Sequence, residues 1–157
     1  MTGRAVVLDS GPLGLLAHPR QHVAIESRVA EWIEAGIAVI IPEIAYYEVR
    51  RELVRLGSQI HLERLDELTR DLTYAAITTP IIIRATGLWA AVRQQGRPTA
   101  DPKALDGDVI LAATAIEISE TGTRVVVASS NVAHLSRFVD ARGWERIPYG
   151  TWDEFSP

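Results

Sequence analysis

Three acidic side chains of this sequence, Asp9, Glu48 and Asp108, stand at or near points where strands are predicted to end or helices to begin. Asp9 follows an apolar run at residues 5–8, which is typical of a strand buried on both faces of a parallel sheet. It therefore falls at the carboxyl end of that strand, where open α/β sheets hold their ligands. Because burying an unpaired carboxylate costs several kcal/mol, an acid in this position needs a partner such as a cation.

Asp9 and its neighbour Ser10 also have a purely structural interpretation. Asp9 is well suited to cap a helix that begins through Ser10, Gly11 and Pro12. Ser10 is suited either to hydrogen-bond a metal-bound water or to cap the turn that follows it. The residue types alone support both interpretations.

Glu48 lies one turn into a helix predicted at residues 43–56, directly after a second strand predicted at residues 37–41. This position can bring its carboxylate to the same edge of the sheet as Asp9. The same helix also carries Arg51, so the alternative for Glu48 is an ion pair with a neighbour at i+3.

Ser129 and Asn131 directly follow the strand predicted at residues 124–128, in the same architectural place as Asp9. The carboxyl ends of parallel strands meet at one edge of a sheet. We therefore expect Asp9 and Asn131 to lie near each other, with Ser129 as a possible supporting residue.

Asp106 and Asp108 precede an apolar helix, and only one of them is expected at the site. Two positions apart on a helix, they point about 200° away from each other. The favoured arrangement makes Asp106 the N-cap and Asp108 the ligand. Asp101 and Pro102 form a rival helix start, which leaves this assignment open.

Carboxylate and amide oxygens, without cysteine or clustered histidine, suit Mg²⁺ or Mn²⁺. Two such ions about 3.5–4 Å apart can activate a water and stabilise the leaving oxygen of a phosphodiester. The chain has no cysteine, and its four histidines lack the spacing of a zinc site. They are His18, His22, His61 and His134.

Strand-like and helix-like patterns alternate along the chain. Strands are predicted at residues 5–8, 37–41, 72–78, 124–128 and 145–148. Helices are predicted at residues 12–17, 20–35, 43–56, 60–72, 80–95, 108–120 and 132–140. This order indicates an α/β fold with a mostly parallel sheet and helices on both faces. No repeat, linker or low-complexity segment divides residues 1–157, so one domain is expected.

The net charge of −4 argues against a broadly basic surface for binding nucleic acid. Lys103 is the only lysine beside many arginines, and this bias neither supports nor excludes a nucleic-acid substrate. There is no apolar run of about 20 residues and no signal-peptide pattern, so no membrane association and a cytoplasmic location are expected.

Four segments together resemble the PIN-domain nucleases, and in particular the VapC-like toxins of bacterial toxin–antitoxin pairs. These segments are residues 7–10, 42–49, 108–115 and 129–131, and the resemblance runs from about Val6 to Phe138. An Asp after a strand is common by itself. The order and spacing of the segments, with the Asp-x-x-Leu-Ala-Ala pattern that Asp108 begins, make the resemblance fairly specific.

The resemblance implies a three-layer α/β/α Rossmann-like PIN domain and an Mg²⁺- or Mn²⁺-dependent endoribonuclease. Asp9, Glu48 and Asp108 match the first three acids of the family, and Asn131 stands at the fourth position, which is often Asp. Its neutral oxygen weakens the charge available to a second metal ion. His134 and Leu135 replace an Asp-Phe pair that often follows. The resemblance also implies an RNA substrate, a homodimer and an antitoxin protein that holds the toxin inactive.

Other functions remain in competition at this stage. A haloacid-dehalogenase-like phosphohydrolase needs a second acid two residues after Asp9, where Gly11 stands. A phospho-receiver needs a lysine at a later strand end, and Lys103 is badly placed for it. A catalytically weak binding module that keeps the fold is supported by Asn131, whereas the three retained acids argue against it.

Overall fold

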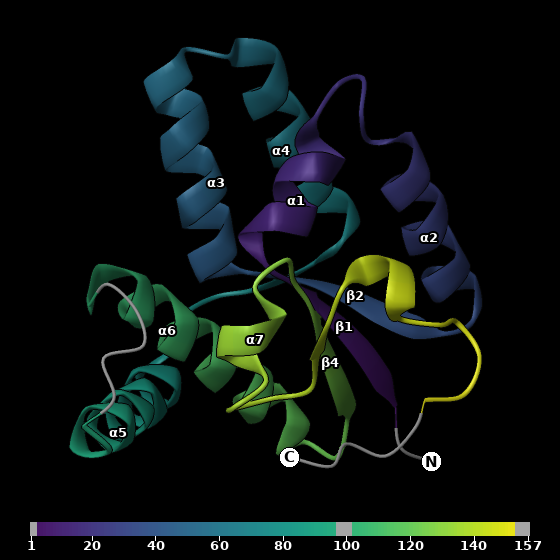
Figure 1. Cartoon of the computed structure of the whole chain (residues 1–157). Helices are drawn as coiled ribbons and strands as arrows, with labels where there is room; N and C mark the ends of the chain where they lie inside the picture. Colours follow the sequence, from purple (N-terminus) through teal and green to yellow (C-terminus); the bar gives the residue numbers. More distant parts are fainter. Residues whose placement is uncertain (1–2, 97–101, 153–157) are drawn as a thin grey trace.

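A parallel five-stranded sheet forms the centre of the protein, in the order β3-β2-β1-β4-β5 (Figure 1). The computed structural model describes residues 3–96 and 102–152. The strands are β1 (Arg4–Leu8), β2 (Ile37–Pro42), β3 (Thr73–Ala75), β4 (Arg124–Ala128) and β5 (Ala141–Arg142). The chain runs outward from β1 through β2 to β3, and then returns to the other side of β1 to form β4. The sheet therefore has its topological switch point between β1 and β4.

Helices cover both faces of this sheet, which confirms the predicted three-layer α/β/α architecture. The helices are α1 (Ser10–Ala17), α2 (Val23–Glu34), α3 (Glu43–Leu56), α4 (Gln59–Asp71), α5 (Thr79–Gln94), α6 (Pro102–Ser119) and α7 (Val132–Leu135). In Figure 1, α5 and α6 lie on the left of the sheet and α2 lies on its right. None of the helices in the described segments is long and apolar enough to cross a membrane.

The alternation of side chains along the strands divides the core into two layers. Val6 and Leu8 of β1 pack with α1, α2 and α4 on one face. Ala5 and Val7 point to the opposite face and pack with α6 and α7. Because β1 is buried on both faces, its sequence is a continuous apolar run rather than an alternating one.

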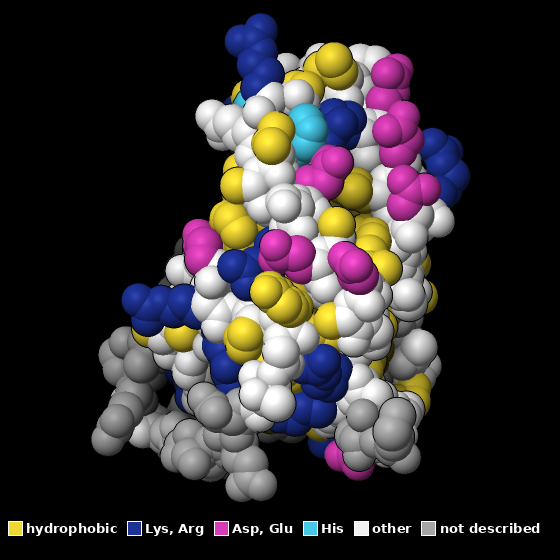
Figure 2. All heavy atoms as spheres, turned by 90° about the vertical axis from the view of Figure 1, so that its right-hand side faces the viewer, with side chains coloured by type: hydrophobic (Ala, Val, Ile, Leu, Met, Phe, Trp, Pro, Cys, Tyr) yellow, Lys and Arg dark blue, Asp and Glu magenta, His cyan; other side chains and the backbone are white. Residues whose placement is uncertain are grey.

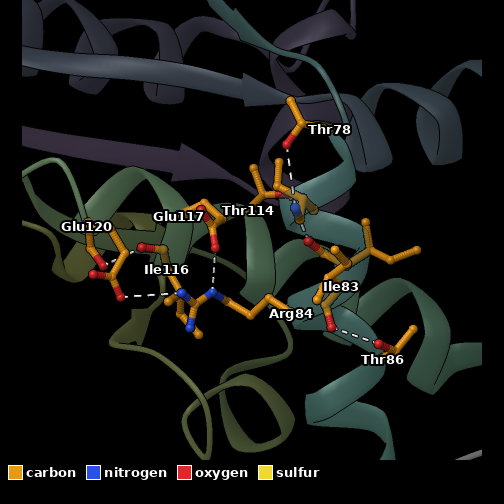
Figure 3. A network of polar contacts seen from close by, with 11 residues as sticks. Thr78, Ile83, Arg84, Thr86, Thr114, Ile116, Glu117 and Glu120 are labelled. Carbon is orange, nitrogen blue, oxygen red and sulfur yellow. Dashed lines mark hydrogen bonds and ion pairs between the residues drawn. The ribbon is translucent and has the colours of Figure 1, made fainter.

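The helix α5 packs on α6 rather than on the sheet, and its apolar side chains form a third cluster with those of α6. Arg84 of α5 fastens the outer side of this pair (Figure 3). Its Nε lies 2.7 Å from an oxygen of Glu117, and its Nη2 lies 3.4 Å from an oxygen of Glu120. At the start of α5, the Thr78 hydroxyl oxygen accepts a hydrogen bond from the Ile81 N–H.

The surface seen from the α2 side carries acidic, basic and hydrophobic side chains interspersed (Figure 2). No single kind of side chain covers this face. Such mixing fits the small net charge of the chain, which is −4.

The predicted strand at residues 145–148 is wrong. The edge strand is β5, and residues Trp144–Arg146 form a single 3₁₀ turn, η1. Asp140 is 7% exposed and forms ion pairs with Arg124 of β4 and Arg142 of β5. These ion pairs hold the edge strand against β4, four residues earlier in the sequence than expected. The predicted helix at residues 132–140 is accordingly shorter, since the chain must rejoin the sheet at Ala141.

Ile147 is fully buried for a different reason than strand pairing. Its carbonyl oxygen accepts hydrogen bonds from Trp32 Nε1 at 3.0 Å and from an Arg28 Nη at 3.2 Å. Trp32 is itself completely buried in α2. This contact ties the C-terminal part of the described chain to the helix layer that begins far earlier in the sequence.

We expect Trp32→Phe to lower the free energy of unfolding by roughly 1–3 kcal/mol, because the Ile147 carbonyl loses its fully buried donor and keeps only the partly exposed Arg28. Urea unfolding followed by circular dichroism measures the change. Ile33→Ala is the matched control on the same helix: Ile33 is 51% exposed, so its truncation should cost about 0.5 kcal/mol or less. Equal losses in the two variants would show that the Trp32 contact does not anchor the C-terminal segment.

Candidate functional site

Asp9 and Ser129 meet at the switch point of the sheet. The β1–β4 pairing continues one residue beyond β1, since the Asp9 N–H donates to the Ala128 carbonyl at 2.9 Å. In the next residue of the chain after Ala128, the Ser129 hydroxyl donates to Asp9 Oδ2 at 2.6 Å. The prediction that these strand ends lie together is therefore confirmed. Figure 1 shows α1 and α3 rising from this edge of the sheet.

Asp9 is also the N-cap of α1. Its backbone is extended, and its Oδ1 accepts a hydrogen bond from the Ser10 N–H at 2.7 Å. The capping interpretation is thus correct, and the helix begins at Ser10 rather than at Pro12 as predicted. Capping does not remove Asp9 from the site, because its other oxygen faces Ser129. The proposed role of the Ser10 hydroxyl stays a prediction.

Asn131 contacts Asp108 directly and is linked to Asp9 through Ser129. Its backbone N–H donates to the Ser129 hydroxyl oxygen at 2.8 Å, and its Nδ2 donates to Asp108 Oδ1 at 3.5 Å. A chain of contacts therefore runs from Asp9 through Ser129 and Asn131 to Asp108. Ser129 is almost completely buried, so this chain is shielded from solvent at its centre.

Asp108 reaches the site from the middle of α6. From Asp108 to the end of α6 at Ser119 is a rise of about 17 Å, which matches the length of the five-residue strand β4 that follows. The carboxylate therefore lies level with the carboxyl ends of the strands. Its Oδ2 is buried and has no hydrogen-bond partner among the described residues. Burial and the Asp9 charge raise the pKa of Asp108, against the opposing effects of His134, Arg137 and the Asn131 amide.

Glu48 completes the group from α3. Burial first, and then the charges of Asp9 and Asp108, raise its pKa, while the charge of Arg51 lowers it. A Cβ atom at Gly107 would lie 3.4 Å from Glu48 Oε1, so α6 passes close beside this carboxylate. The carboxylates of Asp9 after β1, Glu48 in α3 and Asp108 in α6 thus influence one another electrostatically.

The alternative of an ion pair between Glu48 and Arg51 does not hold in the structure. Among the ion pairs of the described residues, none includes Glu48. The Arg51 guanidinium lies over the Tyr47 ring instead, 5.2 Å from its centre.

Asp106 faces away from the acids. It is exposed and lines a groove of about 360 Å³ between α5 and α6, beside Ile82 and Trp89. The predicted divergence of Asp106 and Asp108 is therefore confirmed. The cap role of Asp106 is wrong, because α6 begins at Pro102, the rival start, and Asp106 lies inside the helix.

Sequence reasoning missed two glycines that allow this close packing. A Cβ at Gly11 would come within 2.9 Å of the Ser130 hydroxyl oxygen, so a larger residue there would require the Ser130 side chain to shift. Gly107 lets Glu48 approach α6. For Gly107 the available signal was a glycine directly between two candidate acids, inside a helical pattern.

The donors fit a hard divalent cation in their chemistry. They are carboxylate, amide and hydroxyl oxygens, and the unpartnered buried Asp108 Oδ2 is the kind of atom that a cation would satisfy. Within the described residues, no three His, Asp or Glu side chains are arranged to hold a metal ion directly as they stand. The fit therefore rests on donor type, charge and burial.

Comparisons with known proteins agree with this geometry. A model of the PIN domain matches residues 17–131, a range that includes Glu48, Asp108 and Asn131 and begins after Asp9. Comparison with curated protein sequences gave no match.

The fold is similar to solved toxin–antitoxin structures. VapBC-1 from nontypeable Haemophilus influenzae matches with a TM-score of 0.65 and 18% identity, over 90% of this chain and 99% of that one. FitAcB from Neisseria gonorrhoeae gives the same values. VapBC2 from Rickettsia felis, bound to a promoter DNA fragment, matches with a TM-score of 0.65 and 14% identity, over 89% and 98% of the two chains. At these identities the likeness concerns the fold, and it is the family model, matched over most of the sequence, that assigns the chain: it belongs to the PIN domain family.

Proposed function

We propose that this PIN domain is an Mg²⁺- or Mn²⁺-dependent endoribonuclease that hydrolyses RNA phosphodiesters. The observation that carries the proposal is the convergence of three mutually repelling carboxylates, Asp9, Glu48 and Asp108, at the switch point of the sheet. Holding like charges together is unfavourable unless a cation offsets them. A phosphodiester substrate brings further negative charge, so a divalent ion serves both needs.

Asp9, Glu48, Asp108 and Asn131 would hold the ion. When bound, it would lower the pKa of a water and stabilise the negative charge that develops on the phosphodiester. Ser129 fixes the orientation of Asp9 by donating to Oδ2. Asn131 contributes a neutral oxygen, so the protein offers three negative charges rather than four.

The cellular role we propose is the toxin of a type II toxin–antitoxin pair. The solved structures of similar fold are VapBC and FitAB complexes, and two of them include DNA. Their composition supports an antitoxin protein as partner. A homodimer is part of the same proposal and rests on the family resemblance of the sequence. DNA contacts in those complexes belong to those proteins and supply no substrate for this one.

A catalytically weak PIN-fold binding module is the second candidate. The observation in its favour is the Asn131 amide, whose Nδ2 donates to Asp108 Oδ1 at 3.5 Å. A donor in this place partly offsets the Asp108 charge without a metal ion. Metal binding and cleavage by the unmodified protein distinguish the two candidates.

Removing one acid should stabilise the metal-free protein at neutral pH. The pKa values of Glu48 and Asp108 are raised above the ordinary 4.5 and 3.8. In the pH interval between the ordinary and the raised values, the folded state therefore binds more protons than the unfolded state. The free energy of unfolding therefore falls as pH rises from the ordinary pKa values through the raised ones. Glu48→Gln and Asp108→Asn should raise the Tm by a few degrees above this interval and give no gain below it.

Glu52→Gln is the control on the same helix, because Arg55 lowers the pKa of Glu52 and this substitution should give no gain in Tm. Mn²⁺ should raise the Tm of the wild-type protein more than that of Glu48→Gln or Asp108→Asn. Differential scanning calorimetry with and without Mn²⁺ measures both effects. A wild-type Tm that Mn²⁺ leaves unchanged would favour the binding module.

Asp108→Asn should reduce RNA cleavage by about 100-fold or more, whereas Asp106→Asn should leave it unchanged. The first substitution removes charge from the site, where several kcal/mol of stabilisation are at stake and each 1.4 kcal/mol is about tenfold in rate. Asp106 lies in the α5–α6 groove on the other side of the helix. Asp9→Asn should resemble Asp108→Asn. Rates are measured on single-stranded and structured RNA with Mn²⁺, and an inactive Asp106→Asn beside an active Asp108→Asn would refute the assignment of the third acid.

A further inference from the structure

Arg51 stands out among the three arginines of α3 by its partner. Arg50 lies 3.6 Å from Asp66 of α4, and Arg55 pairs with Glu52 on its own helix. The described residues provide no carboxylate within ion-pair distance of Arg51. Its guanidinium lies over the Tyr47 ring instead, 5.2 Å from the ring centre. An arginine held over an aromatic ring, with no acid to neutralise it, can accept an anionic ligand.

Helical geometry places this pair beside the acidic site. Looking down α3, Arg51 lies about 40° from Tyr47 and about 60° from Glu48, so its position on the helix is between theirs. The charge of Arg51 acts on Glu48, in agreement with this placement. Tyr47 is 56% exposed, so more than half of the residue is open to solvent even though the Arg51 guanidinium lies over its ring.

We propose that Tyr47 and Arg51 form a subsite for single-stranded nucleic acid, in which a base stacks on the Tyr47–Arg51 pair and a neighbouring phosphate contacts the guanidinium. This inference rests on the proposed function and names the residues that position its substrate. Base stacking on aromatic rings, combined with arginine, is the usual means of binding single strands without reading their sequence. The positive charge of Arg51, next to Glu48, also offsets the repulsion between the acids and an approaching phosphate.

A protein partner is the competing occupant of this face. Val54 is 57% exposed and lies a little less than one turn beyond Arg51 on the same side of α3, so Tyr47, Arg51 and Val54 form a stripe that a second copy of the chain could cover. Covering Arg51 with an apolar surface would bury an unpaired charge, which is unfavourable by several kcal/mol. The phosphate of a nucleic acid satisfies the guanidinium directly, and for this reason the observations favour the nucleic acid.

The chain contains a matched control for this test. On α5, Arg93 lies over the Trp89 ring at the same distance, 5.2 Å. Trp89 lines the apolar α5–α6 groove together with Asp106, on the side of α6 away from Asp108. Arg93→Gln therefore removes an equivalent stacked arginine away from the acidic site.

Binding is measured by fluorescence anisotropy with a labelled single-stranded RNA of about 12 nucleotides. All proteins carry Asp108→Asn to suppress cleavage, and Mn²⁺ is present. Tyr47→Ala should weaken binding roughly 5- to 100-fold, whereas Tyr47→Phe, which keeps the ring, should change it less than about twofold. Arg51→Gln should weaken binding and reduce the slope of log affinity against log salt by about 0.7, the value for one phosphate contact on a single strand. Arg93→Gln should change neither quantity.

Equal RNA binding by Arg51→Gln and Arg93→Gln would overturn the subsite. So would unchanged RNA binding by Tyr47→Ala together with a loss of self-association in light scattering, which would assign this face to a second copy of the chain. Cleavage by the protein with Asp108 intact is measured in parallel. If it cleaves RNA while the Arg51 result is negative, only the subsite is wrong; a protein that neither binds nor cleaves RNA overturns the proposed function as well.

Discussion

The repulsion among the half-buried carboxylates of Asp9, Glu48 and Asp108 is the constraint to which the rest of the structure is adapted. These side chains come from the residue after β1, from α3 and from α6, and no local interaction would bring them together. The apolar sheet does so, because parallel pairing of β1 with β4 fixes Asp9 beside Ser129 through the backbone. The free energy of burying the two core layers thus opposes the electrostatic cost of the site. The favourable burial is spread over the whole core, whereas the unfavourable repulsion is concentrated at one edge of the sheet, as is expected at a functional site.

The sequence contains enough local information to predict most of the elements and the placement of the acids. Continuous apolar runs identify β1, β2 and β4, and Asp9 and Ser129 stand at strand ends in the sequence as in the fold. The argument that Asp106 and Asp108 point in opposite directions needs only the helical repeat, and it holds. These successes depend on periodicities that span a few residues.

The failures of prediction at the sheet edge and between helices involve contacts between distant residues. The two-residue strand β5 exists because Asp140 is held by Arg124 and Arg142, and a segment this short has no periodicity of its own. The start of α6 is a local failure, because Pro102 and Asp106 are both suited to the beginning of a helix and the helix begins at the earlier residue. The approach of Gly107 to Glu48 joins α6 to α3, and nothing in either helix pattern specifies it.

Asn131 shows how a departure from the pattern of a family acquires a physical meaning once the contacts are known. As a sequence feature it weakens the case for a second metal ion. In the structure its backbone and amide groups join Ser129 to Asp108, and Ser129 in turn holds Asp9. A carboxylate in this place would add a fourth negative charge and could not donate to Asp108. The amide therefore lowers the negative charge of the site and adds a donor toward Asp108, while the link toward Asp9 runs through the backbone N–H of the same residue and Ser129.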